Sequence, residues 1–396
     1  MAQFGDFTVD RNSTKYVLGS GGTIIPSATD EPAFEFNADG SYKGLLVEPA
    51  ATNICLQSED FGTTWNVNTT TVTTNVATAP DGNTTADRVS ADSDGSYRYI
   101  RQTLNLTATG YTFSCYLKYD GSAQWVWLLG ETDRDTFFWF DLQNGVIGGS
   151  GTATGGTIAG QTYSHSIEDI GNGWYRCSAY FVKTSAAGNE EVGFGLADAD
   201  EVATATSGDG VLAWGAQLET GPIATSYIPT TTASVTRNKD DITLGSASSL
   251  IGQTEGTLYL EVDWRLTTGV TQFLLIASDG TNSNYIRISS DGSPAELRMY
   301  AIAGGSTETQ QGEASTAYTG IQKIAFAYKT DDFELYRNGS SVSSDTSGSL
   351  AALATLTDID LGQRWDASNQ ANMWIRAVAL YPKRLSDAEA QALTTL

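Results

Sequence analysis

The chain has 396 residues, of which 40% are hydrophobic and 10% aromatic, so it has enough apolar side chains to fold and enough length for two or three domains. Its formal net charge of −24 opposes contact with nucleic acid or an anionic membrane, and no run approaches the roughly 18 apolar residues of a membrane span. Only 17% of the residues are charged and 41 are glycine, a composition that favours many short strands over long helices.

Residues 1–59 mix isolated aromatic residues with turn residues. They lack the clustered apolar residues of an independent core, so we expect an extended N-terminal attachment arm that becomes ordered against another subunit or the next domain. The first residues also lack the basic and apolar regions of a secretory signal, and we therefore expect synthesis in a cytosol. Cys55, Cys115 and Cys177 lie far apart in the sequence and are expected to be buried thiols.

Residues 60–237 alternate between short apolar-patterned runs and turn residues. In the run 111–118 apolar and polar residues alternate, as in a strand with one buried face. The runs 124–129 and 136–141 are apolar on both faces, which is typical of strands in the middle of a sandwich. This part of the chain is therefore predicted to form an antiparallel β-sandwich.

A polar stretch at 230–241 marks a domain boundary, and residues 238–396 again show strand patterns. The predicted strands cover 257–264, 272–277, 285–289, 296–301, 323–329 and 373–381. Asn338 and Gly339 predict a tight hairpin, because both positions of a type I′ turn require positive φ. We therefore predict a second antiparallel sandwich and an all-β fold class.

The C-terminus is the one segment predicted to be helical. Ser386 and Glu389 have the spacing of a capping box. The expected apolar stripe of this short helix consists of Leu385, Ala388, Ala392 and Leu393.

Five motifs follow one another along the chain. They are Gly44-Leu-Leu-Val-Glu-Pro-Ala-Ala-Thr-Asn53; Gln57-Ser-Glu-Asp-Phe61; Pro80-Asp-Gly82 with Ala86-Asp-Arg88; Gly173-Trp-Tyr-Arg176; and Trp214-Gly-Ala-Gln-Leu-Glu219 with Ser226-Tyr-Ile-Pro229. Together they resemble a module common in virion proteins of tailed bacteriophages. The resemblance covers residues 44–237 and implies a carbohydrate-binding jelly roll over residues 60–237.

Two further segments carry a looser resemblance. Trp374-Ile-Arg-Ala-Val-Ala-Leu-Tyr381 and Leu385-Ser-Asp-Ala-Glu389 resemble the end of a concanavalin A-like or laminin G-like sandwich, which would cover residues 238–396. The resemblance to phage proteins implies a tail fibre, head spike or capsid decoration on the virion exterior. The implied partners are other virion proteins, host-surface polysaccharide and further copies of the chain, with a trimer favoured as in phage fibres.

Catalysis has few candidates in the sequence. His165 is the only histidine, no nucleophile-elbow sequence accompanies it, and we expect it in a solvent-facing strand or loop. Concanavalin A-like folds include glycoside hydrolases, whose strand signature places acids at its first, third and sixth positions. Glu261 and Asp263 fill the first two, but Leu266 stands at the sixth. We therefore expect a protein that is not an enzyme.

Sugar binding requires exposed aromatic rings beside polar groups that bind hydroxyls. The candidates for this role are Trp125, Trp127, Trp139, Trp365 and Asp366. Packing in the core is the alternative for each tryptophan, and exposure is easiest to justify for Trp365, which lies between a strand and a polar loop.

No cofactor is expected, apart from a structural Ca²⁺ ion as an open alternative. Asp198 and Asp200 are its candidate ligands, and solvated turn acids are the competing interpretation. The favoured function is a non-enzymatic structural protein of a phage particle that mediates adhesion to host glycan, assembly of the virion, or both. A polysaccharide-degrading hydrolase or lyase is the alternative function.

Overall fold

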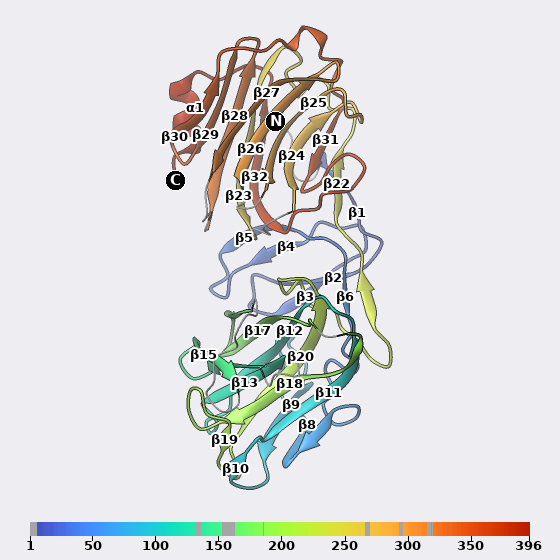
Figure 1. Cartoon of the computed structure of the whole chain (residues 1–396), viewed down its shortest axis with the longest axis vertical. Helices are drawn as coiled ribbons and strands as arrows, with labels where there is room; N and C mark the ends of the chain where they lie inside the picture. Colours follow the sequence, from blue (N-terminus) through green and yellow to red (C-terminus); the bar gives the residue numbers. More distant parts are fainter. Residues whose placement is uncertain are drawn as a thin grey trace.

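The computed structural model describes residues 6–130, 136–152, 163–184, 186–265, 270–292, 296–314, 318 and 320–396. Two β-sandwiches are stacked along the long axis of the molecule, which confirms the predicted all-β class (Figure 1). The described part of the chain contains one α-helix, α1 (Asp387–Thr394), which packs near the C-terminus. Among the described residues no helix has the length and apolar character needed to cross a membrane.

The first sandwich has two six-stranded sheets. One sheet has the strand order β15 (Val146–Thr152), β14 (Thr136–Asp141), β13 (Trp125–Gly130), β18 (Gly188–Ala197), β11 (Tyr99–Leu106) and β7 (Asn66–Asn68). The other has the order β16 (Ser164–Gly171), β17 (Trp174–Val182), β12 (Gly110–Tyr119), β20 (Gly210–Thr220), β9 (Ala86–Ala91) and β8 (Thr70–Ala77). All three cysteines are free and buried in this sandwich, as expected.

The second sandwich has two seven-stranded sheets. The first runs β1 (Thr8–Asp10), β22 (Asp241–Leu244), β31 (Asp358–Leu361), β24 (Gln272–Ser278), β25 (Tyr285–Asp291), β26 (Glu296–Ala303) and β27 (Ser306–Ala314). The second runs β30 (Ser340–Asp345), β29 (Asp332–Arg337), β28 (Gln322–Lys329), β23 (Glu255–Trp264), β32 (Met373–Tyr381), β5 (Tyr42–Val47) and β4 (Phe34–Phe36). Their facing side chains form one continuous core.

The N-terminal arm contributes to both sandwiches. Its strands β1, β4 and β5 complete the second sandwich, whereas β2 (Lys15–Leu18) and β3 (Ile24–Ser27) place Leu18 and Ile24 against the first, in part as expected. β1 pairs with β22, and β5 pairs with β32, so the arm supplies edge strands to both sheets (Figure 1). Phe7, Val9, Leu45 and Val47 enter the second core. Pairing satisfies the backbone groups of the arm and buries its few apolar side chains, which the segment cannot do alone.

The chain then passes from the second sandwich into the first and back again. The two crossing segments pair with each other as β6 (Ala51–Asn53) and β21 (Val235–Arg237). The first sandwich is therefore inserted between the arm and the rest of the second sandwich. Residues 238–396 alone lack three of the strands that complete the second sandwich.

Three minor predictions can be compared with the structure. The Asn338-Gly339 hairpin is confirmed, since both residues have positive φ between β29 and β30. The capping box of Ser386 and Glu389 is also confirmed. The predicted apolar stripe of α1 is partly wrong, because Ala388 and Ala392 are exposed and Ala390 is buried against the sheet instead.

A buried ion cluster holds the arm, the crossing segments and the two sandwiches together. This junction ion cluster consists of Arg11, Lys15, Glu48, Arg237 and Asp240, whose side chains are all almost fully buried. Asp240 contacts Arg11 at 3.0 Å and Lys15 at 2.7 Å. Glu48 contacts Lys15 at 3.1 Å and accepts a hydrogen bond from the backbone N of Ser226 at 2.8 Å.

The cluster predicts a pH dependence of stability. Although burial raises the pKa of Glu48, the charges of Lys15 and Arg237 and a hydrogen bond from Ser226 hold that pKa well below its ordinary value. A depressed carboxyl pKa stabilises the fold above the unfolded pKa, about 4.3, and this stabilisation is lost as the pH falls.

We therefore expect the urea midpoint of the wild-type protein to fall steeply from about pH 5 downward. In Glu48→Gln, the overall midpoint should be lower and its dependence on acid weaker, since this group no longer titrates. Identical pH slopes in the two proteins would contradict this role of Glu48.

Candidate functional site

The outer face of the sheet that contains β24, β25 and β26 is hollowed into a groove of about 690 Å³, called here the aromatic groove. Strand alternation builds its floor. On β25, Ile286 and Ile288 point into the core, so Tyr285 and Arg287 point outward into the groove. The segment between β31 and β32 borders the groove and carries Trp365.

Aromatic rings and guanidinium groups are layered in the aromatic groove. The rings of Trp365 and Tyr285 lie 5.4 Å apart, centroid to centroid, and both side chains are only partly buried. The guanidinium of Arg364 lies 4.3 Å from the centre of the Trp365 ring, and that of Arg287 lies 4.0 Å from the Tyr300 ring. The stacking fixes the orientation of these rings, which can receive the apolar face of a ring-shaped ligand.

Each guanidinium of the groove is paired with a carboxylate. The pairs are Arg287–Asp291 at 3.1 Å, Arg364–Asp366 at 3.3 Å, and Arg298–Glu296 in direct contact. Hydrogen bonds from Ser368, together with Arg364, hold the pKa of Asp366 below its ordinary value although slight burial raises it. The groove thus offers donors and acceptors side by side with little net charge.

Trp365 and Asp366 are predicted from the sequence as binding residues, and the structure places Trp365 in the groove with Asp366 paired to its neighbour Arg364. Tyr285, Arg287 and Tyr300 are not among the predicted residues. The strands that carry them were predicted, and the alternation of 285–291 already places Tyr285 and Arg287 on the outer face. What the sequence did not show is that these strands lie beside the segment that carries Trp365.

The tryptophans of the first sandwich do not form a comparable site, which corrects part of the prediction. Trp127 is 0% and Trp139 is 1% exposed, so neither ring can stack on a ligand. Trp139 Nε1 donates a hydrogen bond to the carbonyl of Val202 at 2.8 Å. Trp125 is partly buried beside this cluster. The loop before β19 (Thr204–Ala205) thus covers the outer face of this sheet, and the sequence patterns do not predict that burial.

The carboxylates of the hydrolase signature lie away from the groove. Glu261 and Asp263 are on β23, in the sheet opposite the one that forms the groove. Glu261 is engaged by Arg376 at 2.9 Å. Leu266, the departure from the signature, lies outside the described residues.

The candidate calcium ligands Asp198 and Asp200 hold loops. Asp198 accepts hydrogen bonds from the hydroxyls of Thr204 and Thr206, and Asp200 accepts one from the backbone N of Gly149. Within the described ranges, no group of three or more histidine, cysteine or acidic side chains is placed to hold a metal ion.

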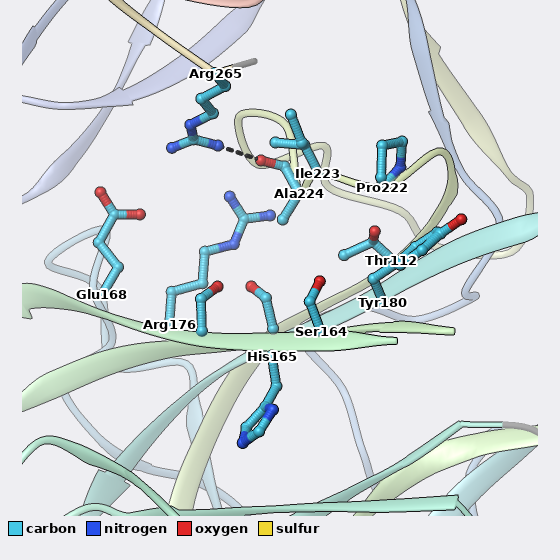
Figure 2. Close-up of a pocket in the computed structure, with 12 residues that line it drawn as sticks. Thr112, Ser164, His165, Glu168, Arg176, Tyr180, Pro222, Ile223, Ala224 and Arg265 are labelled. Carbon is cyan, nitrogen blue, oxygen red and sulfur yellow. Dashed lines mark hydrogen bonds between the residues drawn. The ribbon is translucent and has the colours of Figure 1, made fainter. Parts of the chain in front are cut away.

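A second cavity of about 440 Å³, the inter-sandwich cavity, lies where the two sandwiches meet (Figure 2). Alternation along β16 directs Ser164, Ser166 and Glu168 into it. From the second sandwich, Arg265 donates a hydrogen bond to the carbonyl of Ala224 at 2.7 Å across the cavity rim.

His165 points away from the inter-sandwich cavity, on the other side of its strand (Figure 2). Its ring centre lies 5.4 Å from that of Phe138 and 5.6 Å from that of Phe140. Nε2 is 3.0 Å from the carbonyl oxygen of Gly148. The predicted solvent-facing position is therefore wrong, and the ring packs between the sheets of the first sandwich.

Comparison with known protein families bears on the second sandwich. Residues 236–391 match the family model described as the Concanavalin A-like lectin/glucanases superfamily. The second sandwich therefore has a concanavalin A-like fold. The match begins in β21 and therefore does not include the three arm strands that complete the two sheets.

Among solved structures, the chain is similar to carbohydrate-binding and toxin domains. The CBM40 domain of the Ruminococcus gnavus IT-sialidase is 16% identical over 38% of this chain and 88% of that chain, with a TM-score of 0.33. The same domain bound to alpha2,3 sialyllactose gives 16% identity, 38% and 86% coverage, and a TM-score of 0.33. The binding domain of botulinum neurotoxin DC in complex with rat synaptotagmin II is 12% identical, with 40% of each chain covered and a TM-score of 0.33. No curated protein matches the chain in sequence.

Proposed function

We propose that this protein is a non-enzymatic, lectin-like adhesin that binds host-surface glycan in the aromatic groove. The observation that carries the proposal is the contacting pair of aromatic rings, Trp365 and Tyr285, beside paired arginine and carboxylate side chains. Aromatic faces bind the apolar side of a sugar ring, and adjacent donors and acceptors bind its hydroxyl groups. The lectin-like class of the second sandwich supports the same proposal.

We further propose that the protein acts on the exterior of a tailed-phage particle, as a fibre, spike or decoration, after synthesis in the host cytoplasm. The five motifs between residues 44 and 229 support this location. A trimer is favoured, because several weak glycan sites held together gain avidity that one site lacks. Locating the chain by electron microscopy of the intact particle tests this part of the proposal.

The alternative function is degradation of the polysaccharide by hydrolysis or elimination. Hydrolysis requires two suitably spaced carboxylates at the bound sugar. The signature acids Glu261 and Asp263 lie on the sheet opposite the groove, which favours binding without turnover.

Binding and degradation differ in whether new chain ends are formed in the polysaccharide. Full-length protein incubated with host capsule or lipopolysaccharide should retain the polysaccharide at millimolar to micromolar strength, roughly −4 to −8 kcal/mol per site. Reducing ends and unsaturated ends should not increase above those of the untreated polysaccharide. New ends that disappear in Glu261→Ala would replace the adhesin with a hydrolase. Absence of retention on every host glycan would leave assembly of the virion as the function.

A further inference from the structure

The inter-sandwich cavity contains a buried cation that has no carboxylate partner. Arg176, from the Gly173-Trp-Tyr-Arg176 motif, is only 7% exposed and lines the cavity. Its Nη1 donates to the carbonyl of Thr225 at 2.6 Å and its Nη2 to the hydroxyl of Ser114 at 3.0 Å. Within the described parts of the chain, Nε has no acceptor and the guanidinium forms no ion pair. Both partners are neutral, so the charge of Arg176 is solvated but not neutralised by contact.

The cavity lining contains two guanidiniums and one carboxylate. Arg265 brings a second guanidinium, which hydrogen-bonds a carbonyl and stacks 4.4 Å from the centre of the Trp374 ring. The one carboxylate of the lining, Glu168, is already paired with Lys43 at 2.7 Å. Against the effect of burial, Lys43, Arg265 and Arg176 lower the pKa of Glu168 to about 2. The lining therefore carries two positive charges and one negative charge, and outside it Glu219 and Glu48 also attract the guanidinium of Arg176.

Hydroxyl groups surround these two guanidiniums. Ser164 and Ser166 on β16 face Ser178 and Tyr180 on β17, all on the same side of the sheet. The volume of about 440 Å³ lies within the range of small-molecule sites and exceeds what an inorganic anion requires.

We infer that the inter-sandwich cavity is a second binding site, for a monosaccharide-sized acid of the hexuronate class. In this assignment Arg176 and Arg265 hold the carboxylate, and the serine and tyrosine hydroxyls bind the ring hydroxyls. The site is independent of the aromatic groove, whose arginines are all paired with carboxylates. It also differs in place, because it combines residues of both sandwiches.

The probe pair for this site is glucuronate and glucose, which differ in one carboxylate on the same ring. Calorimetric titration of the full-length protein should give glucuronate an affinity at least about tenfold higher than glucose, since charge-assisted hydrogen bonds are lost with the carboxylate. Equal affinities, or no binding of glucuronate, would overturn the assignment.

Variants locate the site. Arg265→Gln removes one guanidinium, and Ser166→Phe fills the cavity without changing charge; each should weaken glucuronate binding by about tenfold or more. Arg176→Gln should weaken glucuronate binding to the same extent if circular dichroism shows that this variant is folded. If it is not folded, Arg265→Gln and Ser166→Phe decide whether the cavity is the binding site. Lys329→Gln is the matched control, because it removes an exposed positive charge elsewhere on the second sandwich.

Trp365→Ala separates this site from the aromatic groove. Glucuronate affinity should stay within about twofold of the wild type in this variant, whereas retention of host polysaccharide should fall. Glucuronate binding that is lost in Trp365→Ala and kept in Ser166→Phe would overturn the cavity as its site.

Discussion

Asp240→Ala should lower the free energy of unfolding by about 3–5 kcal/mol, the cost of removing one partner from a buried ion cluster. Asp240 contacts both Arg11 and Lys15, and its Oδ2 also accepts a hydrogen bond from the backbone N of Glu48. The substitution leaves three buried cations with one carboxylate, Glu48, which contacts Lys15 and Arg237. Asp240 lies where the chain returns to the second sandwich, and it contacts Arg11 and Lys15 of the arm. In the variant, the arm strands and the rest of the second sandwich should therefore unfold less cooperatively.

Urea unfolding followed by tryptophan fluorescence measures this change. Glu31→Ala is the matched control, since it removes an exposed carboxylate from the same arm and should change the free energy of unfolding by no more than about 0.5 kcal/mol. A loss below about 1 kcal/mol in Asp240→Ala would mean that the junction ion cluster does not hold the arm in place.

Trp365→Ala should weaken binding of host polysaccharide by about 2 kcal/mol per site, or roughly thirtyfold. The ring is partly exposed, and it lies between Tyr285 at 5.4 Å and the guanidinium of Arg364 at 4.3 Å. Its removal takes away the largest apolar face of the aromatic groove. The loss of stability should be modest, because the ring is not part of either sandwich core.

Trp125→Ala is the matched control for this prediction. Its ring is also partly buried, but it lies on the outer face of the first sandwich, far from the groove in the chain fold (Figure 1). Surface plasmon resonance with immobilised capsule or lipopolysaccharide compares the two variants, and circular dichroism confirms that both are folded. Binding that survives in Trp365→Ala and is lost in Trp125→Ala would move the glycan site to the first sandwich.

The motifs that resemble phage virion proteins meet at the junction of the two sandwiches. Asn53 donates from its amide to the carbonyls of Ala216 and Ile228, at 3.0 and 2.8 Å. Gln217 accepts from the backbone N of Ile228 at 2.8 Å. Residues far apart in the sequence are thus connected by hydrogen bonds, so these motif positions stabilise the packing of distant segments. Arg176, from another of the five motifs, instead faces the inter-sandwich cavity.

Local patterns in the sequence were sufficient for the strands, the hairpin at Asn338 and the capped helix. A side chain's face on a strand follows from its neighbours, and positive φ and capping depend on residues within one turn. The same patterns predicted both sandwiches, and they distinguished Trp365, beside a polar loop, from tryptophans within apolar runs.

The tertiary structure decided which strands lie together and which rings stay exposed. The sequence of residues 1–59 does not indicate which sheet its strands will join, because pairing at a sheet edge uses backbone groups that every residue possesses. Trp139 is covered by a loop more than sixty residues away, and the aromatic groove combines β24–β27 with the segment that precedes β32. Sequence determines the faces of each element, but burial and binding arise from contacts between elements, and these depend on the packing of the whole chain.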